Sequence, residues 1–402
     1  MSYSYPDSIK RRSRFLLITL LALPLLSACV DDDETEVVII EPGPVYSGEA
    51  IIATVASDFS SGATSVASVD KPRTIVNDIS PTISDITVTT DGNNIYRLER
   101  FMADNVTKFS VQKPGEVIWQ YSTLDAGEDG SSNPHDFVVA SDSKAYILRY
   151  GKAKAWVVNP SATTADGFKT GEIDLSAYDP DGVPQMDKGI IVNGKLFIAM
   201  QALDPSWAPG QAYVAVIDIA TDTEIDTEKS TINNGIPLPI TSPEKLHYSA
   251  DTGLIYIQGA GRLGFPAWDI DAEYDGGIIS LDPESYEIEM IVDDGDSQSA
   301  PYGNIADMAI VSATKGYFVG YDGWQDNTLY SFNPTTGDVN PTAVANIFAK
   351  DIADIEVDRL GMLWVASRGD FGVIIVEPAT DLSEEQILST GALVPDTIVF
   401  TQ

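Results

Sequence analysis

The stretch "PHDFVVASDSKAYILRYGKAKAWVVNP", residues 134–160, contains three short apolar runs separated by two polar turns. The first run follows an acidic residue, Asp136, and ends at the turn Ser-Asp-Ser-Lys. The second run, "AYILRY", ends at "GKAK", and "AWVV" follows as the third. Apolar runs of about four to eight residues bounded by turn residues are typical of β-strands. The stretch therefore predicts three consecutive strands.

The same pattern recurs along the chain. Each copy has an acidic residue, an alternating strand, a tight turn and a second apolar strand, and it continues into a third strand and an outer fourth one. The other copies are "SDITVTTDGNNIYRLER" from Ser84, "MDKGIIVNGKLFIAMQ" from Met186, "PEKLHYSADTGLIYIQG" from Pro243, "ADMAIVSATKGYFVGYDG" from Ala306 and "ADIEVDRLGMLWVASRGD" from Ala353. Four-stranded repeats of roughly 40 to 60 residues are typical of β-propeller blades.

The two ends of the repeat region complete one further blade. The last residues, "PDTIVFTQ", supply an acid-led first strand with nothing after it, while residues 49–70 supply a second and a third strand with no first. No helical periodicity of useful length follows Cys29. We therefore predict an all-β fold over residues 49–402, a seven-bladed β-propeller with a split closing blade formed by both termini.

Two hairpins carry a resemblance to a known group of propellers. "TVTTDGNNIYRL" and "IIVNGKLFIAM" each have a strand, a tight turn and a second apolar strand, and this order resembles the blades of YVTN/NHL-type seven-bladed propellers. The resemblance covers about residues 49 to 402 and implies the fold. It does not imply one function, because such propellers serve as enzymes, scaffolds and receptors.

The N-terminal residues 1–28 predict a bacterial lipoprotein signal peptide. Basic residues precede the apolar run "FLLITLLALPLL", and "LSAC" ends at Cys29, which resembles a lipobox. Cleavage before Cys29 and its lipidation would leave an acidic, flexible tether at residues 29–48 and place the protein in the cell envelope, at the outer membrane. The alternative is a plain signal peptide with a chance cysteine. Cys29 is the only cysteine, so an intramolecular disulfide is excluded.

The charge narrows the range of partners. The full chain has a formal net charge of −36 at pH 7. Such a surface repels nucleic acid and favours cations or basic partners. We expect a monomer that binds an envelope protein or a small ligand and contacts the membrane through its lipid.

One acidic residue occupies the same position in every blade and would begin the innermost strand. The seven are Asp85, Asp136, Asp187, Glu244, Asp307, Asp354 and Asp396. These carboxylates would form a ring at one end of the propeller's central channel, here called the upper mouth, and such a ring suits a hard cation such as Ca²⁺. The candidate metal ligands are Asp136, Asp187, Glu244, Asp307 and Asp396.

The alternative is that these acids are structural. In that case Arg97 or Arg100 pairs with Asp85, Arg149 pairs with Asp136, and Arg368 pairs with Asp354. The remaining acids would lack a basic neighbour and could accept backbone N–H groups from the adjoining blade.

Candidate ligand-binding residues are expected on the same side of the propeller as the ring acids. His135 adjoins the ring acid Asp136, and long loops carry Trp207, Phe265, Trp268, Tyr274 and Trp324. The aromatic residues could form a wall for a sugar, a peptide or another ligand, or they could pack over the blades as a lid.

The sequence favours a binding or scaffold module, lipid-anchored in the envelope, that works through its upper face. No nucleophile elbow, redox cysteine pair or phosphate loop is present, and no catalytic residue is assigned. The alternative is a Ca²⁺-dependent propeller hydrolase or lyase with Asp136, Asp187, Glu244 and Asp307 among the ligands and His135 as the base.

Overall fold

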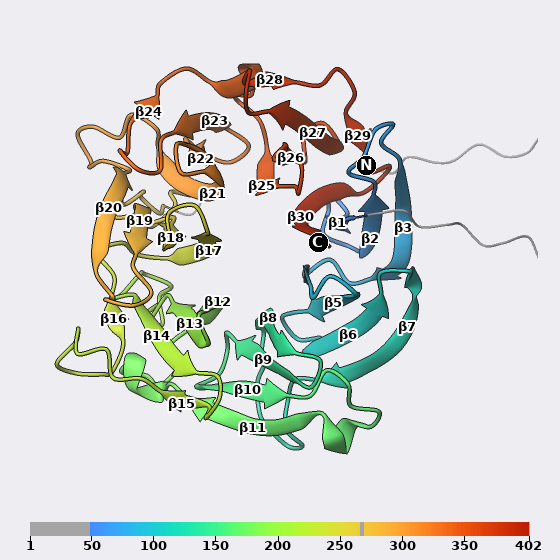
Figure 1. Cartoon of the computed structure of the whole chain (residues 1–402), viewed down its shortest axis with the longest axis vertical. Coiled ribbons are helices and arrows are strands. Elements are labelled where there is room, and N and C mark those ends of the chain that lie inside the picture. Colours follow the sequence, from blue (N-terminus) through green and yellow to red (C-terminus); the bar gives the residue numbers. More distant parts are fainter. Residues whose placement is uncertain (1–48, 266–268, 402) are drawn as a thin grey trace, which may run out of the picture. The chain divides into compact units, whose positions relative to one another are not determined.

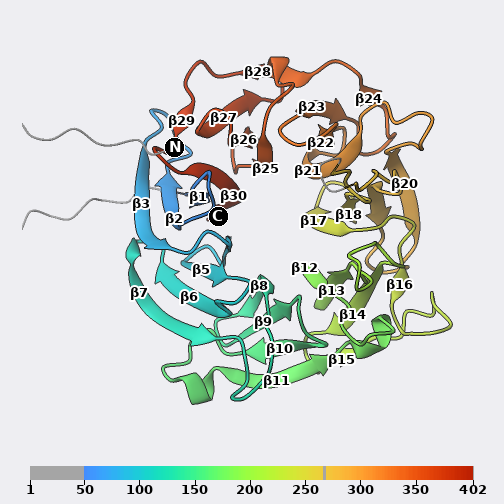
Figure 2. The ribbon, with the colours of Figure 1, turned by 180° about the vertical axis from the view of Figure 1, so that it is seen from behind.

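A computed structural model describes residues 49–265 and 269–401. Seven antiparallel sheets follow one another around a central channel, as Figures 1 and 2 show from the two sides. This confirms the predicted all-β, seven-bladed β-propeller. The predicted signal peptide, the tether and Cys29 lie outside the described residues. Among the residues that are described, no helix is long and apolar enough to cross a membrane.

Six blades are each formed by one continuous stretch of chain, from the inner strand to the outer one. Blade 1 has β4 (Ile86–Thr90), β5 (Asn94–Glu99), β6 (Asn105–Ser110) and β7 (Lys113–Ser122); blade 2 has β8 (Pro134–Ser141), β9 (Lys144–Arg149), β10 (Lys154–Val158) and β11 (Lys169–Asp174); blade 3 has β12 (Met186–Val192), β13 (Lys195–Met200), β14 (Tyr213–Asp218), β15 (Thr223–Glu224) and β16 (Ile236–Pro237). Blade 4 has β17 (Pro243–Ser249), β18 (Leu254–Gly259), β19 (Gly277–Leu281) and β20 (Ile288–Asp293); blade 5 has β21 (Asn304–Ser312), β22 (Lys315–Tyr321), β23 (Asn327–Phe332) and β24 (Val339–Asn340); blade 6 has β25 (Ile352–Val357), β26 (Leu363–Ser367), β27 (Gly372–Glu377), β28 (Leu382–Ser383) and β29 (Leu388–Ser389).

Both ends of the repeat region form the seventh sheet, which we call the clasp blade. Its strand order is β3 (Ile75–Thr82), β2 (Gly62–Ala67), β1 (Ala50–Val55) and β30 (Val394–Phe400). The C-terminal strand β30 is innermost and pairs antiparallel with β1, so that Ile52 lies opposite Ile398. The predicted split closing blade is therefore confirmed.

The core is divided among the interfaces between neighbouring blades. The middle strands β9, β13 and β18 are almost fully buried because each is covered by a blade on both faces, which explains their continuous apolar sequences. Seven clusters of buried apolar residues result, one between each pair of adjacent blades. The ring is thus held together by hydrophobic packing around its whole circumference.

The turns sort onto two faces of the ring. The inner and second strands of a blade are joined by tight turns; in blade 3, Asn193 and Gly194 both have positive φ, 51° and 78°, between the paired residues Val192 and Lys195. This is the two-residue hairpin that "NG" predicts. The loops between second and third strands, and those between blades, emerge on the opposite side, which we call the upper face.

Candidate functional site

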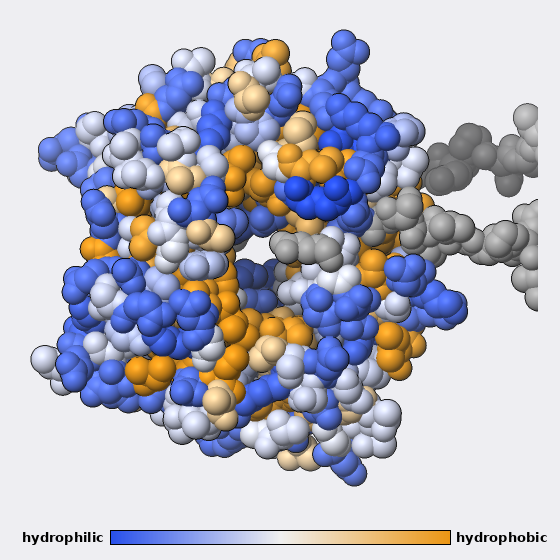
Figure 3. Space-filling view, in the orientation of Figure 1, coloured by the Kyte–Doolittle hydropathy of each residue, from blue (hydrophilic) through white to orange (hydrophobic). Residues whose placement is uncertain are grey.

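The upper end of the channel contains a cavity of about 530 Å³, which we call the mouth cavity. Every blade contributes to its wall, and the central opening is visible in the space-filling view of Figure 3. Six of the seven predicted acids line it: Asp136, Asp187, Glu244, Asp307, Asp354 and Asp396. Arg100, Lys188, Lys245 and Arg368 also line it, so the wall carries both signs of charge.

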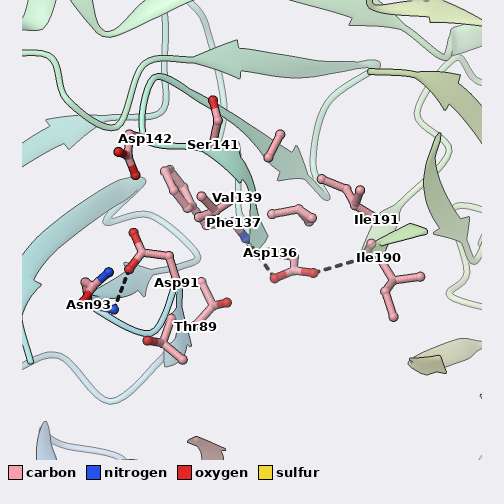
Figure 4. Close-up of a pocket in the computed structure, with 14 residues that line it drawn as sticks. Thr89, Asp91, Asn93, Asp136, Phe137, Val139, Ser141, Asp142, Ile190 and Ile191 are labelled. Atoms are coloured by element: carbon pink, nitrogen blue, oxygen red, sulfur yellow. Dashed lines mark hydrogen bonds between the residues drawn. The ribbon is translucent and has the colours of Figure 1, made fainter. Parts of the chain in front are cut away.

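Three of the acids connect neighbouring blades through the backbone. The carboxylate of Asp136 accepts the N–H of Gly189 at 3.0 Å, that of Asp307 accepts the N–H of Ile355 at 2.6 Å, and that of Asp354 accepts the N–H of Ile398 at 2.7 Å. In each case the donor belongs to the innermost strand of the next blade. Figure 4 shows Asp136 bound in this way. These carboxylates are structural connectors, as the alternative interpretation of the ring anticipated.

Two further acids bind guanidinium groups. Asp85 accepts a hydrogen bond from Arg100 at 2.8 Å, as predicted, and Asp396 binds Arg368. The predicted pairing of Arg368 with Asp354 is wrong, because the side chain reaches forward to the clasp blade instead of back to its own inner strand.

The predicted pairing of Arg149 with Asp136 is also wrong. The guanidinium of Arg149 lies over the ring of Trp156, 4.5 Å from its centroid, and binds Glu128 in the loop before β8. The side chain therefore points away from the channel, towards the outer strands of blade 2.

Sequence reasoning missed Lys245, a cation in the wall of the mouth cavity that contacts three carboxylates. Its ammonium group lies 2.8 Å from Asp354, 3.3 Å from Asp307 and 3.3 Å from Glu356. Burial opposes the charge, but the carboxylates of Asp307, Asp354 and Glu356 outweigh it and raise the pKa of Lys245. Strand alternation does not place the consecutive residues Glu244 and Lys245 in one wall; both line the cavity at a register shift between Pro243 and Lys245, which the sequence did not reveal.

A second network surrounds His135. Its Nδ1 lies 2.9 Å from Asp187, the ring stacks on Tyr150 with centroids 4.0 Å apart, and Gln201 links Tyr150 to Asp187 through hydrogen bonds of 2.7 Å each. Burial lowers the pKa of His135 despite the opposing effect of Asp187. Burial of Asp187 is outweighed by His135, Lys188 and Arg100, so the pKa of this carboxyl is lowered.

These shifts fix the imidazole tautomer at neutral pH. An ionised carboxylate can only accept a hydrogen bond, so Nδ1 of His135 must carry the proton. The neutral ring then has an unshared electron pair on Nε2, and His135 lines the mouth cavity. This nitrogen is an available hydrogen-bond acceptor or base.

Glu244 differs from the other ring acids. Within residues 49–265 and 269–401, its carboxyl has no hydrogen bond and no ion pair. Burial, followed by repulsion from Asp187 and Asp307, raises the pKa of Glu244 to about 8. At neutral pH this carboxyl is therefore mostly protonated and can donate a hydrogen bond into the cavity.

The predicted ligand-binding aromatic residues do not join His135. Of those in the described part of the chain, Trp207 lies between β13 and β14, Phe265 and Tyr274 lie between β18 and β19, and Trp324 lies between β22 and β23. None of these four lines the mouth cavity. Trp207 and Trp324 are 70% and 62% exposed, and Trp268 lies outside the described residues. Their role in binding stays a prediction.

The predicted metal ligands all lie at the mouth, each in a different blade. Among the described residues, no group of three or more His, Cys, Asp or Glu side chains is gathered closely enough to hold a metal ion. Most of the ring oxygens instead bind backbone N–H, guanidinium or ammonium groups. Calcium binding at this position stays a prediction.

A second cavity, of about 460 Å³, lies further down the channel wall between blades 1, 2 and 3 (Figure 4). Its carboxylate Asp91 accepts the backbone N–H groups of Asn93 and Asn94, at 2.9 and 2.7 Å, and the hydroxyl of Tyr96 at 2.8 Å. Although burial opposes ionisation, these donors together lower the pKa of Asp91. Asp91 is thus occupied in holding its own turn, which leaves the mouth cavity as the better candidate site.

Comparison with known proteins supports the fold alone. No protein-family model matches the chain, and no curated protein matches it. Among solved structures, the chain is similar to a putative 6-phosphogluconolactonase from Bacteroides fragilis, with a TM-score of 0.57 and 14% identity over 90% of this chain and 99% of that one. A putative 6-phosphogluconolactonase from Bacteroides uniformis gives 0.54 and 14% over 87% and 98%. Virginiamycin B lyase from Staphylococcus aureus gives 0.51 and 12% over 76% and 84%. The YVTN/NHL resemblance stays a prediction.

Proposed function

We propose that this chain is a lipid-anchored envelope protein whose propeller binds a small, hydroxyl-bearing ligand in the mouth cavity. One observation carries the proposal: His135 and Glu244 line the same cavity, and neither Nε2 of His135 nor the carboxyl of Glu244 is used by the described protein. The other ring acids are occupied in connecting blades or binding cations.

The chemistry of the cavity indicates the ligand class. Nε2 of His135 accepts a hydrogen bond, and the protonated carboxyl of Glu244 donates one. The side-chain oxygen of Gln258, also in the wall, is buried and has no hydrogen-bond partner. Because Gln258 is 0% exposed, a ligand in the cavity does not reach this oxygen, and the ligand class follows from His135 and Glu244. Hydroxyl groups both donate and accept, and the mixed charges of the wall favour a neutral ligand such as a saccharide or a polyol.

The proposal is tested with a panel of monosaccharides and polyols, and binding is measured by thermal unfolding of the propeller. A ligand present at about 100 times its dissociation constant stabilises the folded state by about 2.7 kcal/mol. We expect at least one compound to raise the melting temperature of the wild type but not of His135→Phe or Glu244→Leu. Glu116→Gln, on the outer strand of blade 1, is the matched control and should respond as wild type. No response from any compound, or an equal response in both cavity variants, contradicts the proposal.

The affinity should depend on pH in a defined direction. As the pH rises through the pKa of Glu244, about 8, the carboxyl loses its proton and can no longer donate, so we expect affinity to fall. The variant Glu244→Gln keeps a permanent donor. It should bind near neutral pH and lose the alkaline fall, as isothermal titration at several pH values would show. If the affinity of Glu244→Gln still falls at alkaline pH, a group other than Glu244 causes the fall.

A second candidate function is a lyase or hydrolase, and the orientation of His135 by Asp187 favours it. In this function Nε2 of His135 removes a proton from the substrate, while the protonated Glu244 supplies one to the leaving group. Mass spectrometry of the bound compound after incubation separates this function from simple binding. Product formed by the wild type and lost in Asp187→Asn supports the enzyme, whereas an unchanged compound supports the binding module.

Attachment to the envelope is tested separately from ligand binding. The variant Cys29→Ala removes the thiol that the predicted lipidation modifies. We expect the protein to move from the membrane fraction to the soluble fraction, because acyl chains would supply the membrane affinity. Immunoblots of separated fractions measure this. Membrane attachment that persists in Cys29→Ala contradicts the lipid anchor and leaves the mouth-cavity proposal untouched.

A further inference from the structure

A separate cavity on the upper face, of about 240 Å³, is lined by three aromatic side chains and is here called the aromatic cavity. Phe59 comes from the β1–β2 loop of the clasp blade, Trp324 from the β22–β23 loop of blade 5, and Phe371 from the β26–β27 loop of blade 6. These blades are consecutive in the ring (Figure 1). Loops from three blades thus bring their rings to one place.

The three rings remain exposed although burial would stabilise them. Phe59, Trp324 and Phe371 are 57%, 62% and 42% exposed. Scattered exposed apolar residues are ordinary, but a contiguous exposed group around a cavity is typical of a binding site. The exposed rings therefore favour an interaction with a ligand over a role in the core.

The backbone at two of these residues is strained. Phe59 and Phe371 have φ angles of 57° and 51°, in the left-handed region where a bulky side chain is unfavourable. Each closes a tight turn, with its N–H bound to Ala56 or Arg368. Such strain is known to gather at ligand clamps, and here it orients two of the rings that line the cavity.

The charged part of the wall consists of one carboxylate, Asp351, and one guanidinium, Arg368, whose charge is offset by Asp396 outside the lining. Arg368 is bound by Asp396, and its second contact, to Asp351, is long at 3.8 Å. The carboxylate of Asp351 otherwise receives one long hydrogen bond, 3.4 Å from Gln325. Two carboxylates therefore lie beside one guanidinium, and Asp351 is the one that can accept further hydrogen bonds. The net charge of −36 over the whole chain adds a long-range attraction for cations.

We propose that the aromatic cavity binds an alkylammonium group. The faces of Trp and Phe rings carry negative potential and attract a cation placed over them, and a partly desolvated cage of rings strengthens this attraction. Asp351 supplies a full negative charge at the wall. A methylated ammonium fits this combination better than a strongly hydrated cation, because its methyl groups contact the rings while the charge remains close to the carboxylate.

The test uses choline and its uncharged carbon isostere 3,3-dimethyl-1-butanol as probes, with the mature chain in isothermal titration. We expect choline to bind and the isostere to bind at least about tenfold more weakly, because only choline gains the cation–π attraction. Trp324→Ala and Asp351→Asn should each weaken choline binding by at least about tenfold. Asp351→Asn preserves the side-chain size, so its effect reports charge even if Trp324→Ala disturbs the loop.

Trp207→Ala is the matched control. Trp207 is 70% exposed, has a φ angle of 63° and lies in the corresponding loop of blade 3, outside the aromatic cavity. We expect it to bind choline as the wild type does. The proposal is overturned if the isostere binds as tightly as choline, or if Trp207→Ala weakens choline binding as much as Trp324→Ala does. A third arm with a trimethyllysine-containing peptide identifies the source of the methylated ammonium: stronger binding than choline assigns the site to a modified protein, and weaker binding assigns it to a small ammonium ligand.

Discussion

A chain that lacks residues 395–402 is expected to lose cooperative folding altogether. The deletion removes nearly all of β30, which forms the innermost strand of the clasp blade and pairs with β1 along its length. It also removes the N–H of Ile398 that Asp354 binds and the carboxylate of Asp396 that Arg368 binds. Because a domain is stable by only about 5–15 kcal/mol, we expect the loss of the innermost strand of the clasp blade and of two connections between blades to exceed that margin.

Circular dichroism on heating measures this result, and two further chains sharpen it. A chain that begins at residue 45 lacks only residues 1–44, which precede the described strands in the sequence, and should melt as the longer chain does. Adding the peptide "PDTIVFTQ" to the truncated protein should restore part of the transition, because the missing strand can pair with β1 in trans. An unchanged melting curve after the C-terminal deletion would contradict closure by the split blade.

The variant Lys245→Met should destabilise the propeller strongly. It leaves Asp307, Asp354 and Glu356 close together without their shared cation. Removing one partner of a buried ion pair costs about 3–5 kcal/mol because an uncompensated charge remains. Urea unfolding at neutral pH measures the loss. Lys113→Met is the control: Lys113 and Glu116 are 64% and 70% exposed, and loss of an exposed pair should cost no more than about 1 kcal/mol.

The cost of Lys245→Met should also change with pH. Burial and the nearby Asp354 already raise the pKa of Asp307, and loss of the ammonium group raises it further. A carboxyl whose pKa is higher in the folded state than in the unfolded state favours folding at low pH and opposes it as the pH rises. The difference from wild type should therefore be small near pH 5 and large near pH 8. A difference that does not change with pH would mean that Lys245 acts through packing rather than charge.

The fold could be predicted from local patterns because every blade repeats the same arrangement of buried strands and tight turns. Strands such as β9 and β13 are buried on both faces, so their sequences are continuously apolar, and turns such as Asn193-Gly194 determine the hairpins between inner strands. The split blade was predictable because an unpaired acid-led strand at one end matched a missing first strand at the other.

The candidate site was only partly predictable because equivalent positions in the repeat have different partners. Asp136 and Glu244 occupy the same position in their blades, and burial raises the pKa of both, yet Asp136 accepts the backbone N–H of Gly189 whereas the carboxyl of Glu244 has no hydrogen-bond partner among the described residues. That difference depends on residues of neighbouring blades that lie more than 50 positions away in the sequence, such as Gly189 beside Asp136 and Asp187 and Asp307 beside Glu244. The carboxylate that an arginine side chain binds also depends on residues outside its own hairpin, as Arg149 and Arg368 show.

The most direct test of the proposed site is the pKa of Glu244, measured by NMR on protein with ¹³C-labelled glutamate carboxyls and assigned by comparison with Glu244→Gln. The account predicts a midpoint near 8, unchanged by millimolar Ca²⁺ and displaced by a hydroxyl-bearing compound that binds the mouth. A midpoint near that of an ordinary glutamate, about 4.3, would contradict it, because an ionised Glu244 cannot donate to a ligand. A midpoint lowered by Ca²⁺ would instead identify the mouth as the predicted cation site.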